Sequence, residues 1–537
     1  MPQWNLADCL DRVAAIRGEE DALIQGPHHL SWTQLERRAR NLAAWMVDRG
    51  ATHQAKLALY TYNHPAFMEG VYAGFKAALV PVNVNYRYRD DEVRYLLENA
   101  DAEFVVVHEE FLSVLAAVLP DLPLIKGVLV VTEGGHAALP AFAENYETVA
   151  ETDRPAPAVP RSGEDMMFLY TGGTTGMPKG VMWRQDDLYH RFAGGGLTEP
   201  PATMEAFEAF VQNPPLRLRT LVGPPLMHGT GWFTAMIAWL TGGAVILLDD
   251  PKRFDAMQLW EVVERTRSTA ITIVGDSFAK PMLRALDTAA RPVDISSVLL
   301  IVSSGVMWSR EVKEGLLRHN PNMMLMDAFS SSEAVGMATS VTTKDGASET
   351  AKFMLTDKTR LFDEHLRPLV TRPGVKGLVG VGGPQPVGYY KDPEKSARTF
   401  VEVDGARFSI PGDWAVVNDD GVSLTVLGRG SVCINTGGEK VFPEEVEEVI
   451  KRVEGVHDVV VVGVPDDRWG EAVTAVVSVA GGAVDPEAIK AHVKHHLAGY
   501  KAPKHVVFVD HVYRSPSGKA DFKRTKEVAL EALGRAS

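Results

Sequence analysis

Residues 170–180 carry more chemistry than any other stretch of this sequence. They read Tyr-Thr-Gly-Gly-Thr-Thr-Gly-Met-Pro-Lys-Gly and follow a short apolar run, 166–170, that is typical of a strand. The glycines allow backbone N–H groups to approach an anion without interference from Cβ atoms. The threonine hydroxyls add donors, and Lys179 adds a mobile positive charge. The stretch therefore predicts a loop that binds phosphate groups.

Two other interpretations of this loop are available. The P-loop of nucleotide triphosphatases requires its lysine between a glycine and a Ser or Thr, whereas here Pro178 precedes Lys179 and Gly180 follows it. The spacing excludes that interpretation. A flexible Gly/Thr surface loop without a function is the other alternative.

The loop closely resembles the signature loop of the adenylate-forming enzymes, the superfamily of acyl-CoA synthetases, luciferases and the adenylation domains of peptide synthetases. The resemblance implies that the loop binds the β- and γ-phosphates of ATP and then follows pyrophosphate as it leaves. It also places Thr174 among the catalytic residues. The implied phosphate-binding residues are Thr171, Gly172, Gly173, Thr174, Thr175, Gly176, Met177, Pro178 and Lys179.

Six further segments resemble motifs of the same superfamily, and they follow in the expected order along the chain. Together they are much stronger evidence than any one of them alone. The segments are residues 224–232, 303–306, 327–333, 411–414, 428–431 and 515–519.

The resemblance assigns roles around the nucleotide. Phe329 would stack on adenine, and Glu333 would be catalytic as the ligand of a magnesium ion. Asp413 would accept from the ribose hydroxyls, and Arg429 would donate to the ribose from its rigid guanidinium. Taken alone, Asp413 would rather be a turn residue and Arg429 part of a salt bridge between domains. The residues implied around adenine are Ser304, Gly305, Asp327, Ala328, Phe329, Ser330, Ser331 and Ser332.

Lys519 is the lysine that the resemblance places at the reacting groups. A carboxylate must approach an α-phosphate that is already negative, so positive charge has to face both groups. In the second half-reaction the C-terminal domain would swing about a hinge at 429–431. Gly437, Gly438 and Lys440 would then line the thiol tunnel, where glycine leaves room for a pantetheine arm.

His228, Gly229 and Trp232 lie in the segment that resembles the substrate gate. His228 would step aside to open the acyl pocket, although a lone histidine is more often structural. Trp232 lies one helical turn later, so its indole would line the acyl channel on the same side; a core tryptophan is an equal alternative. Residues 228–245 contain no Asp or Glu. The acid is therefore expected to be hydrophobic and to lack an α-amine, which argues against amino-acid adenylation.

Three positions depart from the commonest pattern of the superfamily. Gly172 replaces a frequent serine, Phe329-Ser330 replaces Tyr-Gly, and Ser431 replaces an Asp or Lys at the hinge. The phenyl ring keeps the stacking surface, so the change at the hinge is the one expected to alter kinetics. Segments 180–184, 386–392 and 428–445 look most like bacterial acyl-CoA synthetases for steroid side chains and other bulky or long acyl groups.

Composition narrows the class of protein further. The net charge of −14 argues against nucleic acid as a partner, because binding its phosphates needs a basic face. Cys9 and Cys433 are the two cysteines of the sequence, which predicts no disulfide framework and a reducing cytoplasm. Neither a secretory signal nor an apolar run of about eighteen residues is evident. The sequence does not exclude peripheral contact with a membrane or assembly into a homodimer.

Apolar runs such as 105–107 and 127–132 alternate with helical patterns such as 32–49. This alternation predicts an α/β fold whose large N-terminal domain has parallel-rich sheets covered by helices. After residue 430 the elements become shorter and predict a small α+β C-terminal domain, which the resemblance implies is mobile. The expected boundaries are 1–428 for the acyl- and ATP-binding domain, 429–431 for the hinge and 432–537 for the AMP-binding lid.

The elements of the C-terminal domain have clear signals. A helix is expected from Pro443, with Glu444 and Glu445 in its first turn, where the helix dipole favours acids. A second helix is expected after Asp485, with Gly499 as its end. The expected strands are residues 459–464, 473–479 and 505–510.

As a whole, the sequence predicts an acid-thiol ligase that activates a hydrophobic carboxylic acid with ATP and Mg²⁺ and transfers it from AMP to CoA. A long-chain fatty acid or a steroid side-chain acid is the expected substrate. An acyl-AMP ligase that loads a carrier protein in trans is the main alternative. A nucleotide-binding protein without activity is a weaker one, because it would not need both Glu333 and Lys519.

Overall fold

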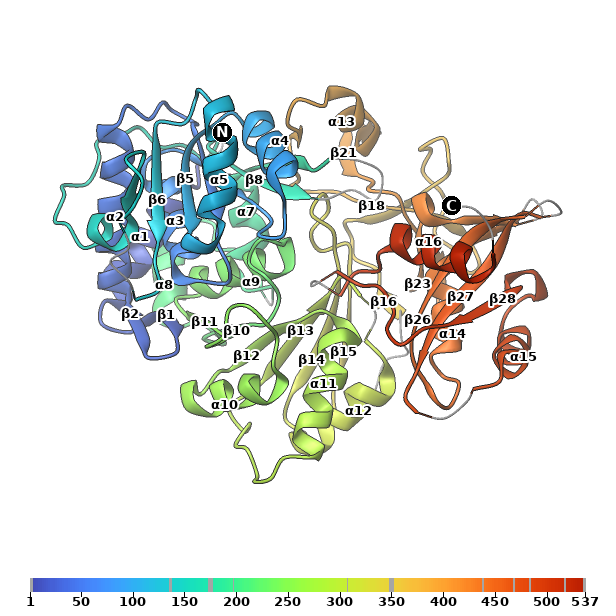
Figure 1. The fold of residues 1–537 in the computed structure, drawn as a ribbon. Coiled ribbons are helices and arrows are strands. Elements are labelled where there is room, and N and C mark those ends of the chain that lie inside the picture. The colour runs from blue at the N-terminus through green and yellow to red at the C-terminus, as the bar shows by residue number, and fades with distance from the viewer. Residues whose placement is uncertain are drawn as a thin grey trace. The chain divides into compact units, whose positions relative to one another are not determined.

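Strands rich in β-branched residues alternate with amphipathic helices and form sheets covered by helices (Figure 1). This computed structural model divides into two units: a large unit, Met1–Thr350 with Gly382–Ser409, and a small unit, Ala351–Val381 with Ile410–Ser537. The side chains of Ser431 and Lys440 are not described. The structure describes residues 3–134, 138–171, 177–196, 198–306, 308–346, 352–436, 439–466, 469–481, 484–515 and 518–534.

An eight-stranded sheet in the large unit has the order β19-β9-β8-β4-β3-β5-β6-β7. Its strands β8, β4, β3, β5, β6 and β7 pair in parallel, whereas β9 is antiparallel to β8 and β19. Its strands are β3 (Lys56–Tyr60), β4 (Val80–Asn83), β5 (Ala102–His108), β6 (Gly127–Val131), β7 (Ala143–Asn145), β8 (Met166–Thr171), β9 (Lys179–Arg184) and β19 (Gly388–Tyr389).

Alternate residues of this sheet face two cores, as the period of a strand requires. Helices α1, α2 and α3 pack on one face, and α4 and α5 pack on the other. The helices are α1 (Leu6–Arg17), α2 (Trp32–Asp48), α3 (Pro65–Lys76), α4 (Asp90–Ala100), α5 (Leu112–Val118) and α6 (Tyr146–Ala150), with short 3₁₀ turns at Glu109–Phe111 and Leu119–Asp121.

A second set of strands in the large unit has the order β2-β1-β11-β10-β12-β13-β14-β15. Pairing is parallel from β1 to β14, and β2 and β15 are antiparallel to their neighbours. The strands are β1 (Asp21–Gln25), β2 (His28–Ser31), β10 (Arg219–Val222), β11 (Ala244–Leu247), β12 (Ala270–Ile273), β13 (Leu300–Ser304), β14 (Met324–Phe329) and β15 (Ala338–Thr342).

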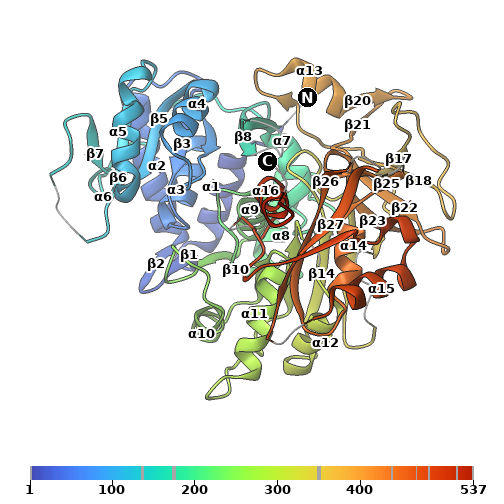
Figure 2. The ribbon, with the colours of Figure 1, turned by 45° about the vertical axis from the view of Figure 1, so that its right-hand side comes forward.

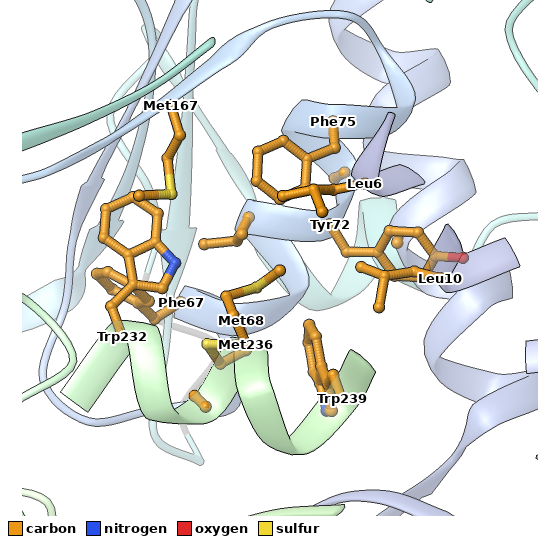
Figure 3. Close-up of a cluster of buried hydrophobic side chains, with 14 of the residues drawn as sticks. Leu6, Leu10, Phe67, Met68, Tyr72, Phe75, Met167, Trp232, Met236 and Trp239 are labelled. Atoms are coloured by element: carbon orange, nitrogen blue, oxygen red, sulfur yellow. The ribbon is translucent and has the colours of Figure 1, made fainter. Parts of the chain in front are cut away.

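Helices cover both faces of these strands. α10, α11 and α12 pack on one face, while α9 and α8 share the opposite core with α1, α2 and α3. Figure 3 shows side chains of α9, α3 and α1 meeting in this core. The remaining elements of the large unit are α7 (Gln185–Phe192), α8 (Met204–Gln212), α9 (Gly229–Leu240), α10 (Ala256–Thr266), α11 (Gly275–Asp287), α12 (Arg310–His319), α13 (Pro393–Thr399), β20 (Phe400–Val403) and β21 (Ala406–Ser409).

The small unit contains two groups of strands, which Figure 2 shows from a second side. In the first, β16, β22, β18 and β17 join β23 through antiparallel pairs. In the second, the long β26–β27 hairpin carries α14 and α15 on one face and α16 on the other. The first group is β16 (Lys352–Met354), β17 (Thr359–Phe362), β18 (Lys376–Val381), β22 (Asp413–Val417) and β23 (Ser423–Arg429).

The second group completes the small unit. Its elements are a 3₁₀ turn at Gly430–Val432, β24 (Ile434–Thr436), β25 (Glu439–Val441), α14 (Pro443–Ile450), β26 (Val456–Asp466), β27 (Gly470–Val479), α15 (Pro486–His496), a 3₁₀ turn at Gly499–Lys501, β28 (His505–Phe508) and α16 (Phe522–Ala532).

The predicted α/β fold with an α+β C-terminal part is confirmed, but one helix end is wrong. α15 ends at His496 rather than at Gly499, because Leu497 is extended and packs its side chain against the core under α14. Gly499 begins a 3₁₀ turn instead. None of the helices in the described ranges combines the length and apolar character needed to span a bilayer.

Candidate active site

The predicted phosphate loop is the connection of a β-hairpin. β8 and β9 pair antiparallel, and Thr171 stands opposite Lys179 at the end of the hairpin. Met177 is exposed and Pro178 is buried just before β9. The hairpin therefore places Lys179 at the base of the loop. The predicted site residues that lie outside the described ranges here are Gly172, Gly173, Thr174, Thr175 and Gly176.

The side chain of Lys179 contacts a segment from much later in the chain. β19 pairs with β9, and the N–H of Tyr390 donates to the carbonyl of Gly180 at 2.8 Å. This pairing brings Asp392 beside Lys179, and the two form an ion pair. The hydrogen bond from Lys179 lowers the pKa of the Asp392 carboxyl. Asp392 was not predicted from the sequence, because nothing near it in sequence points to a lysine so far away.

Glu333 is a buried carboxylate with a defined orientation. The hydroxyl of Tyr389 donates to its Oε1 at 2.9 Å, and the hydroxyl of Ser409 donates to its backbone carbonyl at 2.6 Å. Tyr389 belongs to β19, so one short segment contacts both the predicted magnesium ligand and, through Asp392, the lysine of the phosphate loop. This connection was not predicted from the sequence either.

The two segments predicted to lie against adenine are neighbours in the structure. Ser304 at the end of β13 stands opposite Ala328 in β14, and Phe329 ends β14. Gly305 follows with a φ of 94°, a conformation that favours glycine. These strand ends therefore meet at one edge of the sheet.

Asp327 is buried and forms an ion pair with Lys313 on α12. Burial raises the pKa of the Asp327 carboxyl to about 6, even though Lys313 opposes the shift. Because this carboxylate is engaged with Lys313, a contact with adenine from position 327 would come from the backbone.

The serines after Phe329 form a turn that is fixed by hydrogen bonds. The N–H of Gly336 donates to Ser330 Oγ at 3.0 Å, and the N–H of Ser331 donates to the carbonyl of Ala334 at 2.9 Å. The indole N–H of Trp183 donates to the carbonyl of Ser332 at 3.0 Å. The turn thereby leads from β14 to Glu333 with little freedom.

His228 stands directly before α9, with extended backbone, and the N–H of Trp232 donates to its carbonyl at 3.0 Å. Gly229 allows a close approach here, because a Cβ atom at this position would lie 3.0 Å from Leu169 in β8 and 3.6 Å from Ser332 Oγ. The predicted gate therefore begins α9 next to the phosphate hairpin and the turn that leads to Glu333.

Trp232 has a side chain with 0% exposure. Its indole packs edge-on against Phe67 with ring centroids 5.3 Å apart, and Figure 3 shows it among Phe67, Met167 and Met236. These surroundings favour the core interpretation of Trp232, and its contact with substrate stays a prediction.

Asp413 and Arg429 are cross-strand partners at one end of the β22–β23 pair in the small unit. Arg429 Nε donates to Asp413 Oδ1 at 3.2 Å, whereas the buried Oδ2 has no hydrogen-bond partner among the described residues. A buried carboxylate oxygen without a donor suits a ligand hydroxyl. The predicted ribose pair is thus brought together within one unit.

Glu444 is a buried acid that the sequence pattern explained only through the helix dipole. Its carboxyl packs against Gly428, where a Cβ atom would overlap it, and its Oε2 has no hydrogen-bond partner among the described residues. Burial raises the pKa of Glu444 to about 8; Glu447 and Asp413 add to the rise and Arg429 opposes it. This carboxyl therefore keeps its proton to a higher pH than an exposed glutamate does, beside the predicted ribose pair.

Lys519 is exposed and directly precedes Ala520, which forms a β-bridge with Arg514. The N–H of Ser515 donates to the carbonyl of Lys519 at 2.7 Å. Arg514 is itself anchored by Asp458, because it donates to the two carboxylate oxygens of Asp458 at 2.6 and 2.9 Å. The predicted tunnel glycines Gly437 and Gly438, and the side chain of Lys440, lie outside what the structure describes.

The described residues contain no group of three or more His, Cys, Asp or Glu side chains that could hold a metal ion. A single carboxylate such as Glu333 nevertheless fits Mg²⁺, because this ion is usually bound through one or two carboxylates together with substrate phosphates. The donor set is thus compatible with a magnesium ion that arrives with a nucleotide.

Comparison with known proteins decides the family. The sequence model of the AMP-binding enzymes matches residues 10–390, and that of the AMP-binding enzyme C-terminal domain matches residues 445–519. The chain belongs to the AMP-binding enzyme family.

Curated relatives of this AMP-binding enzyme cover nearly its whole length. A medium/long-chain fatty acid–CoA and 3-oxocholest-4-en-26-oate–CoA ligase of Mycolicibacterium smegmatis is 36% identical, over 98% of this chain and 97% of its own. The 3-oxocholest-4-en-26-oate–CoA ligase of Rhodococcus rhodochrous is 35% identical, over 97% of this chain and 95% of its own.

Solved structures agree with the fold. The anthranilate CoA ligase AuaEII, solved with anthranoyl-AMP, has a TM-score of 0.81 at 20% identity and covers 99% of both chains. ATP-bound MatB of Rhodopseudomonas palustris has a TM-score of 0.80 at 23% identity, with 98% of this chain and 99% of its own covered. The fold of this AMP-binding enzyme is therefore that of adenylate-forming enzymes.

Proposed function

We propose that this protein is an ATP-dependent acyl-CoA ligase. The substrate carboxylate attacks the α-phosphate of ATP to form acyl-AMP and release pyrophosphate, and the CoA thiol then displaces AMP to form the thioester. The observation that carries the proposal is the 36% identity, over almost the full chain, to a ligase of fatty and steroid acids.

The acid is a hydrophobic one, namely a long-chain fatty acid or a steroid side-chain acid. The relatives named above act on medium- and long-chain fatty acids and on 3-oxocholest-4-en-26-oate. In agreement, the segment from His228 through α9 to residue 245 contains no Asp or Glu that could pair with a substrate ammonium.

Each predicted group has a role in adenylation. Lys179 and the loop from Thr171 bind the β- and γ-phosphates. Asp413 Oδ2 accepts from a ribose hydroxyl while Arg429 donates to the same sugar. Lys519 faces the α-phosphate and the carboxylate together and stabilises the charge that develops between them.

Glu333 would hold the magnesium ion that accompanies ATP, and this ion supplies positive charge at the phosphates. The hydroxyl of Tyr389 and the backbone anchor through Ser409 keep the Glu333 carboxylate in one orientation before the ion arrives. Phe329 provides the stacking surface for adenine at the end of β14.

We further propose that residues 432–537 move as a lid about the hinge 429–431 relative to the domain 1–428. The movement would withdraw Lys519 and bring Gly437, Gly438 and Lys440 to the path of the CoA thiol. Cytoplasmic location, peripheral membrane contact and a homodimer stay predictions of the sequence.

The test is a product analysis of the pure protein with ATP, Mg²⁺, CoA and a panel of free acids, from short to long fatty acids and steroid side-chain acids. We expect pyrophosphate, AMP and a thioester with the hydrophobic acids. Acyl-AMP without thioester, at saturating CoA and with several acids, would instead identify a ligase that loads a carrier protein. Activation of amino acids would contradict both.

A further inference from the structure

The ion pair between Lys179 and Asp392 differs from a permanent structural contact, because both partners reach solvent. The Lys179 side chain is 38% exposed and that of Asp392 is 20% exposed. Asp392 also caps the first turn of α13, since its Oδ1 accepts from the N–H of Lys395 at 2.9 Å. Only its Oδ2 therefore serves Lys179.

The backbone around Asp392 is held from several sides. The Tyr390 hydroxyl and the Lys391 ammonium both donate to the carboxylate of Asp101, each at 2.7 Å. On the other side, Tyr389 donates to Glu333. Asp392 is thus fixed in place, whereas Lys179 ends in a flexible four-carbon stem with three donors. If the pair separates, the ammonium is the group that moves.

We propose that Asp392 is the resting partner of Lys179 during turnover. The ammonium that pairs with Asp392 moves to the β- and γ-phosphates when ATP binds, and it pairs with Asp392 again when pyrophosphate leaves. This inference rests on the proposed function, because it requires that the loop binds ATP. Asp392 is here a positioning residue, since it touches Lys179 and not the substrate.

The exposure of the pair sets the size of the effect. Exposed ion pairs contribute little, so their loss changes an equilibrium constant by roughly 2- to 5-fold. Because Asp392 competes with phosphate for the same ammonium, it weakens ATP and pyrophosphate binding by about this factor. The same competition favours the release of pyrophosphate after adenylation.

The decisive variant is Asp392→Asn, in which the amide oxygen can still cap α13 while the negative charge is removed. The dissociation constants of ATP and of pyrophosphate, each with Mg²⁺, are measured by calorimetry on the full-length protein. We expect both ligands to bind about 2- to 5-fold more tightly than to the wild type. Inhibition by pyrophosphate in the full reaction should strengthen in parallel.

Two controls separate this role from a structural one. Glu394→Gln removes an exposed acid of the same helix, α13, which pairs with Arg398 and contacts neither Lys179 nor Asp392, and it should leave both dissociation constants unchanged. In a Lys179→Ala background, Asp392→Asn should have no effect on either ligand, because the ammonium for which Asp392 competes is gone.

Three results would overturn the inference. Unchanged or weaker binding by Asp392→Asn would mean that Asp392 does not compete with phosphate. Tighter binding that persists in the Lys179→Ala background would mean that Asp392 repels phosphate directly. Wild-type protein that binds neither ATP nor pyrophosphate would overturn the proposed function together with this inference, whereas the first two results leave the proposed function intact.

Discussion

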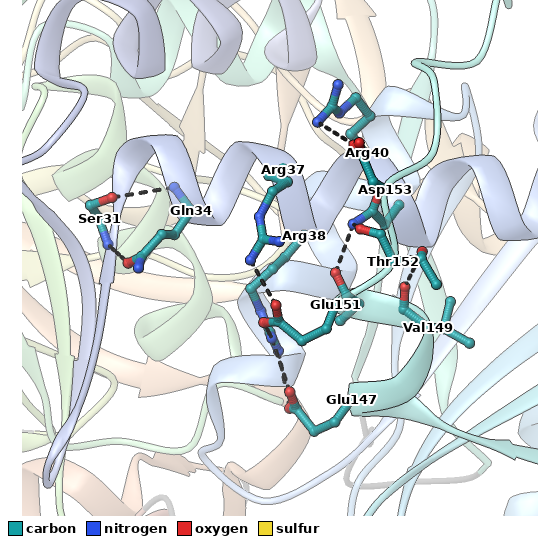
Figure 4. Close-up of polar contacts among 12 residues, drawn as sticks. Ser31, Gln34, Arg37, Arg38, Arg40, Glu147, Val149, Glu151, Thr152 and Asp153 are labelled. Atoms are coloured by element: carbon teal, nitrogen blue, oxygen red, sulfur yellow. Dashed lines mark hydrogen bonds and ion pairs between the residues drawn. The ribbon is translucent and has the colours of Figure 1, made fainter.

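Two clusters of cation and carboxylate in the large unit differ in burial, and the difference separates a structural contact from an exchangeable one. Arg38 Nε donates to Glu69 Oε2 at 2.6 Å, and the side chains are 6% and 1% exposed. The guanidinium also reaches Glu147 at 2.9 Å (Figure 4). Lys179 and Asp392 also form an ion pair between a cation and a carboxylate, but their side chains reach solvent. A buried pair cannot separate without leaving an unpaired buried charge, whereas an exposed pair can.

Removal of the buried cation should have the largest effect. Arg38→Leu leaves Glu69 buried without its partner, and we expect a loss of about 3–5 kcal/mol in the free energy of unfolding, measured with urea. Arg37→Leu is the matched control, because Arg37 is the exposed neighbour that donates to Glu151 at 2.7 Å. Its cost should stay below about 1 kcal/mol. Equal costs would break the comparison between buried and exposed pairs.

Trp232→Ala tests how much a buried side chain contributes to stability when it carries no charge. The indole lies in the core against Phe67, so truncation should lower the free energy of unfolding by about 3–5 kcal/mol. The ranking of acids in a substrate panel should stay as in the wild type. A shift toward longer or bulkier acids, with little loss of stability, would show instead that Trp232 lines the acyl channel.

Lys519→Ala examines an exposed cation that is expected to act on substrate. Formation of acyl-AMP should fall by roughly 10²-fold or more, as the loss of a preorganised charge at a reacting phosphate usually does. The free energy of unfolding and the conversion of supplied acyl-AMP to thioester should remain close to wild type. Equal damage to both half-reactions would contradict a lid that moves between them.

Glu444→Gln should have the smallest effect at acidic pH, because the buried carboxyl still holds its proton there and an amide is a close substitute. Its pKa is raised from 4.5 to about 8 in the fold, so the folded state binds more protons than the unfolded state within that window. Stability of the wild type therefore falls as pH rises from 4.5 to about 8, whereas the amide does not titrate.

The measurement is urea unfolding of Glu444→Gln and wild type at pH 5 and pH 8.5. The difference should move in favour of the variant at the higher pH, because only the wild type carries a titrating carboxyl at this buried place. Glu445→Gln is the control, since Glu445 forms an ion pair with Lys501 at 2.6 Å. A difference for Glu444→Gln that is independent of pH would show that this carboxyl ionises normally.

Local sequence patterns predicted these helices well, because the start of a helix and its buried face depend on residues that are close in sequence. The helix expected over 32–49 is α2, and the helix expected from Pro443 is α14. The end of α15 was wrong, since burial of Leu497 decided it rather than the glycine further on. Tertiary packing overrode a local signal there.

Long-range contacts explain what the sequence could not show about the candidate site. The phosphate stretch and its lysine were visible as one string, but Asp392 and Tyr389 approach it through strand pairing of distant segments. Glu444 and Glu445 are adjacent acids in one helical turn, and only packing assigns one to Gly428 and the other to Lys501.

The pairing of β19 with β9 also determines when this sheet can be completed during synthesis of the chain. Lys179 and Asp392 are 213 residues apart, and between them the chain enters the small unit before it returns to the large one. A ribosome-bound chain that has not reached β19 presents β9 as an open sheet edge, a form that is prone to pair with other chains. This edge can therefore be completed only late in synthesis, because β19 is made after residues 185–387.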